Sequence, residues 1–87
     1  MKYQVILAKK AVKNLRKIDK RYKGRILTAL VRLSSEPYLG KSLVGQLSGR
    51  FSLKIWPYRI IYQILENKLI IYVIIIEHRQ GVYNKYE

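Results

Sequence analysis

The chain contains one uninterrupted apolar run of eight residues, Leu69 to Ile76, "LIIYVIII". Most of its residues are β-branched or aromatic, and these types favour strands. Because neither face of such a strand carries a charged side chain, the rest of the protein must cover both faces. The run is far shorter than the roughly 20 residues that cross a bilayer as a helix. We therefore predict a buried central strand.

Two further segments alternate between apolar and polar residues, as half-buried strands do. In "RFSLKIW" Lys54 is out of phase with the apolar set, and in "YRIIYQIL" Arg59 is out of phase with its neighbours. The break "ENK" at 66–68 is short enough for a hairpin turn. The last strand is central only if the first, "KYQVIL" at 2–7, pairs along its free side. We expect Lys54 and Arg59 to share the open face of the sheet.

Two helices are predicted between the first strand and the second. Apolar residues recur at helical spacing in two stripes, namely Ala8, Ala11, Val12, Leu15 and Ile18, then Tyr22, Ile26, Ala29, Leu30 and Leu33. Asp19 suits the N-cap of the second helix, and Pro37 disfavours helical backbone in the residue before it. The stretch "PYLGKSLVGQLSG", at 37–49, is rich in Pro, Gly and Ser, which indicates a loop.

These elements predict one α+β domain over residues 1–87, in the order strand, helix, helix, three-strand meander. The helical hairpin packs on one face of a mostly antiparallel four-stranded sheet. A chain of 87 residues is too short to divide into two domains that each have a core.

The charge balance points to a polyanionic partner. The chain has 18 Lys and Arg against 5 Asp and Glu, which gives a formal net charge of +13. Such an excess favours binding to nucleic acid, an anionic membrane surface or an acidic protein. The absence of cysteine excludes disulfides, a thiolate nucleophile and a cysteine-ligated metal site. The N-terminal segment lacks the apolar centre of a signal peptide, so we expect a soluble, cytoplasmic protein.

Nine basic residues occupy the helical region, with Asp19 as the one acidic residue among them. Solvated helix faces usually mix both charge signs, so we interpret this set as a surface for RNA or DNA phosphates. An acidic partner protein would fit the same surface. The alternative is a merely solvated face. The nine residues are Lys9, Lys10, Lys13, Arg16, Lys17, Lys20, Arg21, Lys23 and Arg25.

The segments "LSGRFSLKIWPYRIIYQI" and "HRQGVY" together resemble the RelE/ParE superfamily of toxins from toxin–antitoxin pairs. The resemblance covers essentially the whole chain. It implies the RelE-like fold and one of two activities: the RelE branch cuts messenger RNA in the ribosomal A site, and the ParE branch poisons DNA gyrase. Fold alone does not choose between them. The matching residues are Leu47, Gly49, Tyr58, Arg59, Ile60, Ile61, Tyr62, His78, Arg79 and Tyr83.

The resemblance also implies a catalytic set. By its pattern Arg59 contacts the scissile phosphate, His78 or Arg79 is the basic residue that closes the last strand, and Tyr83 serves in acid–base work or base stacking. Lys54 matches one lysine of a pair. Ser52 stands where RelE carries the other lysine, and "WP" replaces a glycine-containing turn, so we expect a differently shaped hairpin before Arg59.

Chemistry supports these positions. Cleavage through the ribose 2′-hydroxyl needs cations that neutralise the transition state, and arginine forms paired hydrogen bonds to phosphate. Histidine is an acid or base near neutral pH. Two structural alternatives stay open: His78 as a solvated surface residue, and Arg59 paired with Glu36 or Glu77. Trp56 is expected to stack on an RNA base, or else to be a plain exposed aromatic.

We expect a ribosome-dependent, metal-independent mRNA endoribonuclease without a cofactor. A ParE-like gyrase inhibitor and a module that only binds an antitoxin or an operator are the alternatives. The expected partners are the ribosome and mRNA, or DNA gyrase, together with a cognate antitoxin that docks on the helical hairpin and the sheet edge. Operator DNA is expected to bind only through the antitoxin complex, and no membrane is involved.

Overall fold

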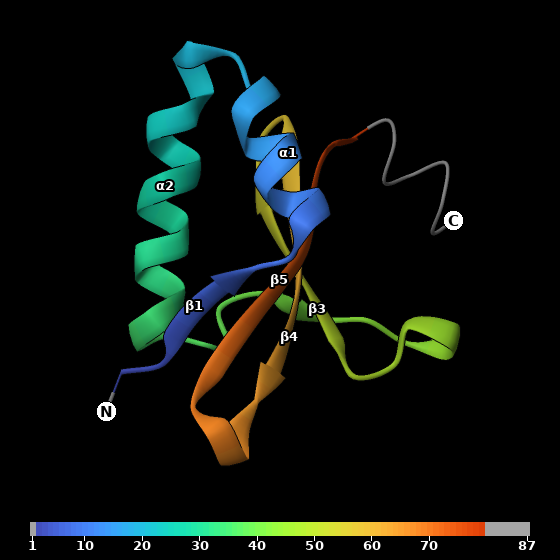
Figure 1. The fold of residues 1–87 in the computed structure, drawn as a ribbon. Helices are drawn as coiled ribbons and strands as arrows, with labels where there is room; N and C mark the ends of the chain where they lie inside the picture. Colours follow the sequence, from blue (N-terminus) through green and yellow to red (C-terminus); the bar gives the residue numbers. More distant parts are fainter. Residues whose placement is uncertain (1, 80–87) are drawn as a thin grey trace.

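The computed structural model describes residues 2–79. A five-stranded sheet has the order β1-β5-β4-β3-β2, in which β1 is parallel to β5 and the other pairs are antiparallel. Two helices connect β1 to the rest (Figure 1). The elements are β1 Gln4–Leu7, α1 Lys9–Lys17, α2 Lys20–Ser35, β2 Lys41–Ser42, the 3-10 turn Gly45–Leu47, β3 Arg50–Ile55, β4 Tyr58–Leu65, the 3-10 turn Glu66–Lys68 and β5 Ile70–His78.

The predicted interior position of the last strand is confirmed, because β5 pairs with β4 on one side and with β1 on the other. The expectation that both of its faces are covered is only partly met, since Tyr72 on the face away from the helices is 36% exposed. The predicted count of four strands is wrong. Within the stretch expected to be a loop, Lys41 pairs with Ser52 and Ser42 with Phe51, which adds the edge strand β2. Two residues are too few for an alternating pattern to be visible in the sequence.

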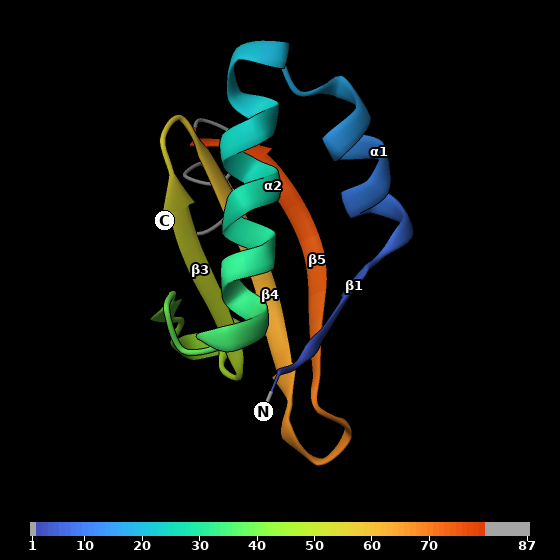
Figure 2. The same cartoon turned by 90° about the vertical axis from the view of Figure 1, so that its left-hand side faces the viewer.

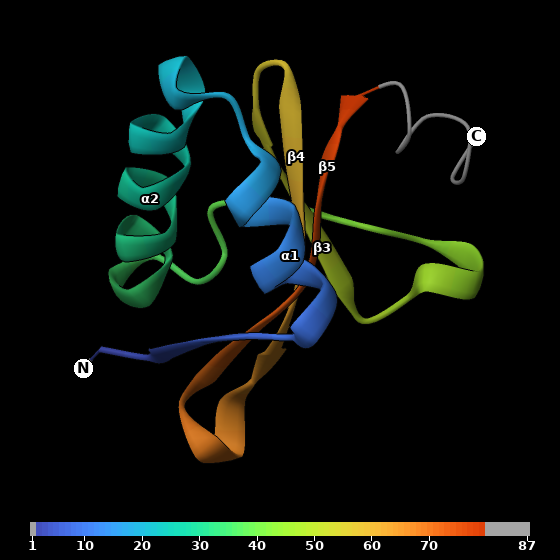
Figure 3. The same cartoon turned by 45° about the horizontal axis from the view of Figure 1, so that its top comes forward.

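Both helices cover the same face of the sheet, as Figures 2 and 3 show. Their predicted stripes supply the core: Ile26 and Leu33 are fully buried against Ile60, Tyr62 and Val73 from the sheet. Asp19 caps α2 as predicted, because its side chain accepts a hydrogen bond from the Arg21 amide. Within the described part of the chain, neither helix has the length and apolar character of a membrane span.

A β-bulge divides β5 into two parts. Tyr62 pairs with Val73, but the preceding residue Ile61 pairs with Ile75, so Ile74 is an extra residue with no partner on β4. An extra residue reverses the face on which all later side chains of the strand lie. The bulge therefore decides which residues at the end of β5 reach the open face.

The buried hydroxyl of Tyr62 fastens the segment after α2 to the sheet. It accepts a hydrogen bond from the Gly40 amide at 2.9 Å and donates one to the Pro37 carbonyl at 2.8 Å. Burial raises the pKa of Tyr62. A Cβ at position 40 would lie 2.7 Å from this hydroxyl and 2.9 Å from the Ser52 carbonyl oxygen, so the close approach requires glycine.

We predict that Tyr62→Phe lowers stability by about 1–3 kcal/mol, since it leaves the Gly40 amide and the Pro37 carbonyl without their partner. For a domain of this size each kcal/mol lowers the melting temperature by roughly 4–8 °C. Thermal unfolding followed by circular dichroism measures the change. Tyr72→Phe is the control, because Tyr72 is 36% exposed. Equal melting temperatures for both variants would contradict the assignment.

Candidate active site

Three charged residues form a row across the open face. Lys54 on β3 pairs with Arg59 on β4, and Arg59 pairs with Glu77 on β5. Directly paired residues point to the same face, and adjacent strands are about 4.8 Å apart. Their neighbours Leu53 and Ile60 lie in the core under the helices, so the row faces the other way. The predicted shared face of Lys54 and Arg59 is confirmed.

The tip of the β3–β4 hairpin adds an aromatic ring and a second arginine to this row. Trp56 and Pro57 form the turn, and the Arg79 amide donates a 2.7 Å hydrogen bond to the Pro57 carbonyl. The Arg79 guanidinium carbon lies 4.5 Å, and the Lys54 Nζ 5.5 Å, from the centre of the Trp56 ring. Both distances allow cation–π attraction. The structure thus brings Lys54, Arg59, Trp56 and Arg79 together.

His78 lies on the other face of the sheet, which corrects the expectation that it joins this set. It pairs with Tyr58, whose ring packs on the helix side, and the two rings meet edge to face with centres 5.5 Å apart. The Tyr58 ring also meets the Tyr22 ring of α2 edge to face, with ring centres 5.8 Å apart. The bulge at Ile74 is the physical reason, because it turns His78 toward the helices.

Glu77 is a site residue that the sequence suggested only as a possible structural partner of Arg59. An unbroken β4–β5 ladder would place Ile76 opposite Arg59, and the bulge places Glu77 there instead. The other suggested partner, Glu36, forms an ion pair with Arg32 at 2.8 Å. The open face therefore carries a carboxylate beside its cations.

Arg50 was not among the predicted site residues, although the alternating pattern of β3 places it on the same face as Lys54. It lies on the same side of the strand as Ser52 and Lys54 and pairs with Gln63 on β4. Ser52, the position of the absent lysine, is only 7% exposed. Arg50 is thus a further cation on the open face, one alternation step beyond Ser52. Tyr83 lies outside the described residues 2–79.

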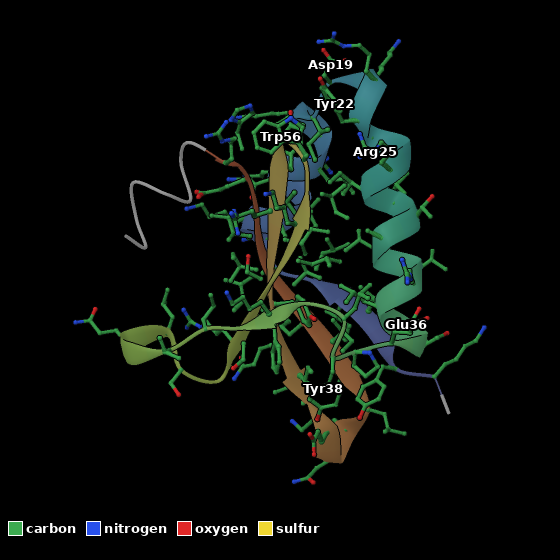
Figure 4. All side chains as sticks on the ribbon, turned by 180° about the vertical axis from the view of Figure 1, so that it is seen from behind. Asp19, Tyr22, Arg25, Glu36, Tyr38 and Trp56 are labelled. Carbon is green, nitrogen blue, oxygen red and sulfur yellow. The ribbon has the colours of Figure 1, made fainter. Side chains whose placement is uncertain are left out.

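The nine helical cations lie at different distances from the hairpin tip. All lie on the helices or the turn between them, and eight are exposed while Lys23 is half-buried. The α1–α2 turn lies at the same end of the molecule as the Trp56 hairpin tip (Figures 1 and 4). Lys17 and Lys20 flank this turn and Arg21 follows it, whereas Lys9 begins α1 at the opposite end of that helix (Figure 1).

Asp19 and Arg21 stabilise the turn that carries these cations. The Arg21 amide donates to Asp19 Oδ1 at 2.9 Å, and the guanidinium lies 3.2 Å from Oδ2. The side-chain hydrogen bond from Arg21 holds the pKa of the Asp19 carboxyl below its usual value. Asp19 and Arg21 thus form an exposed ion pair at the start of α2.

A groove of about 670 Å³ separates α2 from β3. Its floor is apolar and consists of Ala29, Leu39, Leu53 and Ile55. Its rim is basic and consists of Lys20, Arg21, Arg25, Arg32 and Lys54. Figure 4 shows Arg25 on α2 and Trp56 at the hairpin tip toward the same end of the molecule. The groove thus combines the character of a protein-binding cleft with strong positive charge.

Comparison with known proteins places the chain among toxins. A family model described as the ParE toxin of the type II toxin–antitoxin system parDE matches residues 5–83. A chain of the RelBE2 toxin–antitoxin complex from Mycobacterium tuberculosis is 30% identical with a TM-score of 0.83, over 91% of this chain and 100% of that one. A comparison with curated protein sequences found no match.

Two more distant structures share the fold. A mutant of the E. coli toxin RelE in the free state is 21% identical with a TM-score of 0.78, over 99% of this chain and 95% of that one. The archaeal RelE–RelB complex from Pyrococcus horikoshii is 24% identical with a TM-score of 0.74, over 91% and 97%. The fold is that of the RelE-like toxins. Because the family model covers nearly the whole described chain, the chain belongs to the ParE toxin family of type II toxin–antitoxin systems, within the RelE/ParE superfamily.

We predict that the fluorescence of Trp56, the single tryptophan of the chain, reports on the two cations at its ring. Arg79→Gln removes the nearer cation, so we expect a larger change in emission intensity than for Lys54→Gln. Arg50→Gln is the control, since Arg50 lies at the opposite end of β3 from the hairpin tip. An emission spectrum unchanged by Arg79→Gln would contradict the stacked arrangement.

Proposed function

We propose that this toxin is a ribosome-dependent endoribonuclease that cleaves messenger RNA without a metal ion. The observation that carries the proposal is the row of Lys54, Arg59 and Glu77, with Arg79 at the hairpin tip. A gyrase inhibitor acts by binding and needs no such arrangement of cations and carboxylate on a single face.

Each residue of the row has a chemical task. The 2′-oxygen attacks the phosphorus as the bond from phosphorus to the 5′-oxygen breaks, which leaves a 2′,3′-cyclic phosphate and a 5′-hydroxyl. Arg59 binds the non-bridging oxygens through its paired N–H groups, and Lys54 and Arg79 add positive charge. Glu77 accepts the proton of the 2′-hydroxyl. Tyr83, as the family pattern implies, donates the proton to the leaving oxygen.

The hairpin tip and the helical turn hold the substrate. Trp56 is 48% exposed and stacks on a base next to the scissile phosphate. The helical cations bind phosphates of ribosomal RNA, and those nearest the tip, Lys17, Lys20 and Arg21, continue the path that leads to Trp56. His78 supports Tyr58 by packing and takes no part in the chemistry.

We predict that Arg59→Ala lowers the rate of cleavage of ribosome-bound message by about 10²–10³-fold, the usual loss for a group that stabilises transition-state charge. The rate is measured with purified protein and ribosomes programmed with one defined message.

The independence from metal ions needs its own test. Excess Mg²⁺ in a ribosome assay saturates added EDTA, so EDTA is not informative. The test therefore replaces Mg²⁺ with Co(NH₃)₆³⁺, which supports the ribosome without offering metal-bound water.

Two variants are the controls for this prediction. Lys68→Ala lies at the far end of the β4–β5 hairpin. His78→Phe keeps an aromatic ring against Tyr58 and is expected to cleave at the wild-type rate. Wild-type activity in Arg59→Ala would refute the assignment of the open face, and loss of activity in His78→Phe would return His78 to the catalytic set.

Gyrase inhibition is the second candidate, favoured by the description of the matching family model as a ParE toxin. In that case the isolated protein arrests growth with intact messages and induces the DNA damage response. A module that only binds its antitoxin or an operator is the third candidate, and its expression alone leaves growth unchanged.

We further propose that a cognate antitoxin docks in the groove between α2 and β3. Known structures with this fold include toxin–antitoxin complexes. The apolar floor suits the apolar side chains of a peptide segment, and the basic rim selects a segment rich in Asp and Glu. A second groove of about 350 Å³, between β1 and the other side of α2, has no charged residue in its lining, which includes Leu27 and Val31.

We predict that Thr28→Glu weakens antitoxin binding about tenfold or more, because it places a negative charge in the groove that receives acidic side chains. The neighbouring change Leu27→Glu is the matched control, since Leu27 lines the second groove. Isothermal titration with the purified cognate antitoxin gives both affinities. The reverse order, with Leu27→Glu the weaker binder, would place the antitoxin in the second groove.

A further inference from the structure

The second half of β5 lacks the strand partner that the first half has. β1 pairs with Ile70 to Val73, and the hydrogen bond from the Ala8 amide to the Val73 carbonyl, at 2.8 Å, ends this pairing as the chain turns into α1. Beyond that point β4 is the only strand that pairs with β5 among residues 2–79. Past Val73, buried backbone amides of β5 that point away from β4 need an acceptor other than β1.

Asn14 of α1 supplies that acceptor. Its side-chain oxygen Oδ1 receives a hydrogen bond from the Ile76 amide at 3.1 Å. Ile76 itself is only 2% exposed, so this amide has little access to water. The amide oxygen of Asn14 thus takes the place that a carbonyl of β1 would occupy if β1 continued alongside β5.

The sequence context of Asn14 supports a specific role. It lies between Ala11 and Ile18, at helical spacings of three and four residues, and both of these are buried against the sheet. Asparagine is a weaker helix former than alanine or leucine, and a polar side chain on the buried face of a helix costs free energy unless it is bonded.

The hydrogen bond lies beside the candidate active site. Ile76 follows the bulge at Ile74 by two residues and directly precedes Glu77, which faces Arg59. Three residues after Ile76, the Arg79 guanidinium reaches the Trp56 ring. The backbone of this segment is held from the β4 side by its pairing and by the bond from Arg79 to Pro57, and from the other side by Asn14.

We infer that Asn14 is a positioning residue, which fixes the end of β5 so that Glu77 faces Arg59 and Arg79 lies over Trp56. The expected effect of Asn14 on the cleavage rate rests on the proposed nuclease function. Its effect on the positions of Glu77 and Arg79 does not depend on that proposal. Asn14 binds no substrate in this account and acts only through the Ile76 amide.

The test compares two variants of nearly the same size. Asn14→Leu removes the acceptor, and Asn14→Asp keeps an oxygen at the same place. For Asn14→Leu we expect hydrogen exchange at the Ile76 amide to accelerate by about 5- to 150-fold, the range for losing one buried hydrogen bond. We also expect altered Trp56 emission and a lower kcat with little change in KM. Asn14→Asp is expected to restore all three.

The outcomes separate the possibilities. Wild-type exchange, emission and kcat in Asn14→Leu would overturn the inference, and equal defects in both variants would show that Asn14 acts through helix packing alone. If Asn14→Leu does not fold, a scalar coupling across the hydrogen bond, between the Ile76 amide nitrogen and the Asn14 side-chain carbonyl carbon in labelled wild-type protein, decides the geometry. If the wild type cleaves no message but exchange and emission respond as expected, the nuclease proposal fails and the positioning role stands.

Discussion

β5 lies between two strands and under two helices, and the positions of the other elements follow from this packing. Most of its side chains are apolar, so β1 pairs along its free edge and the helical hairpin covers one face. The bulge at Ile74 then sets the orientation of everything that follows it. One unpaired residue in the central strand thereby assigns Glu77 to the open face and His78 to the helix face.

The molecule has two basic surfaces that meet at one end. The open face carries Lys54, Arg59 and Arg79 on a rigid sheet, and the helical hairpin carries cations on the opposite side. The α1–α2 turn and the Trp56 tip join them at the top of Figure 1. A large polyanionic partner could reach both surfaces at once, whereas a single extended strand would have to bend around the tip. This arrangement is the physical basis on which we propose dependence on the ribosome.

Much of the fold was predictable because it depends on periodic patterns. The helical stripes, the Asp19 cap and the shared face of Lys54 and Arg59 follow from spacings of 3.6 and 2 residues. Features that break a period were not predictable. The strand Lys41–Ser42 is too short to alternate, and nothing in "YVIIIEH" marks Ile74 as the extra residue, because every neighbour is equally apolar. The positions of Glu77 and His78 depend on that single residue. The contact of Asn14 with Ile76 joins residues 62 positions apart, beyond the reach of any local pattern.

Mapping of cellular transcript ends after brief induction of the isolated protein decides whether the open face cleaves message on the ribosome. We predict discrete new ends inside translated reading frames, each with a 2′,3′-cyclic phosphate on the upstream fragment, and none in untranslated RNA. Intact transcripts in growth-arrested cells would contradict it, and would make the row of Lys54, Arg59 and Glu77 part of a binding surface.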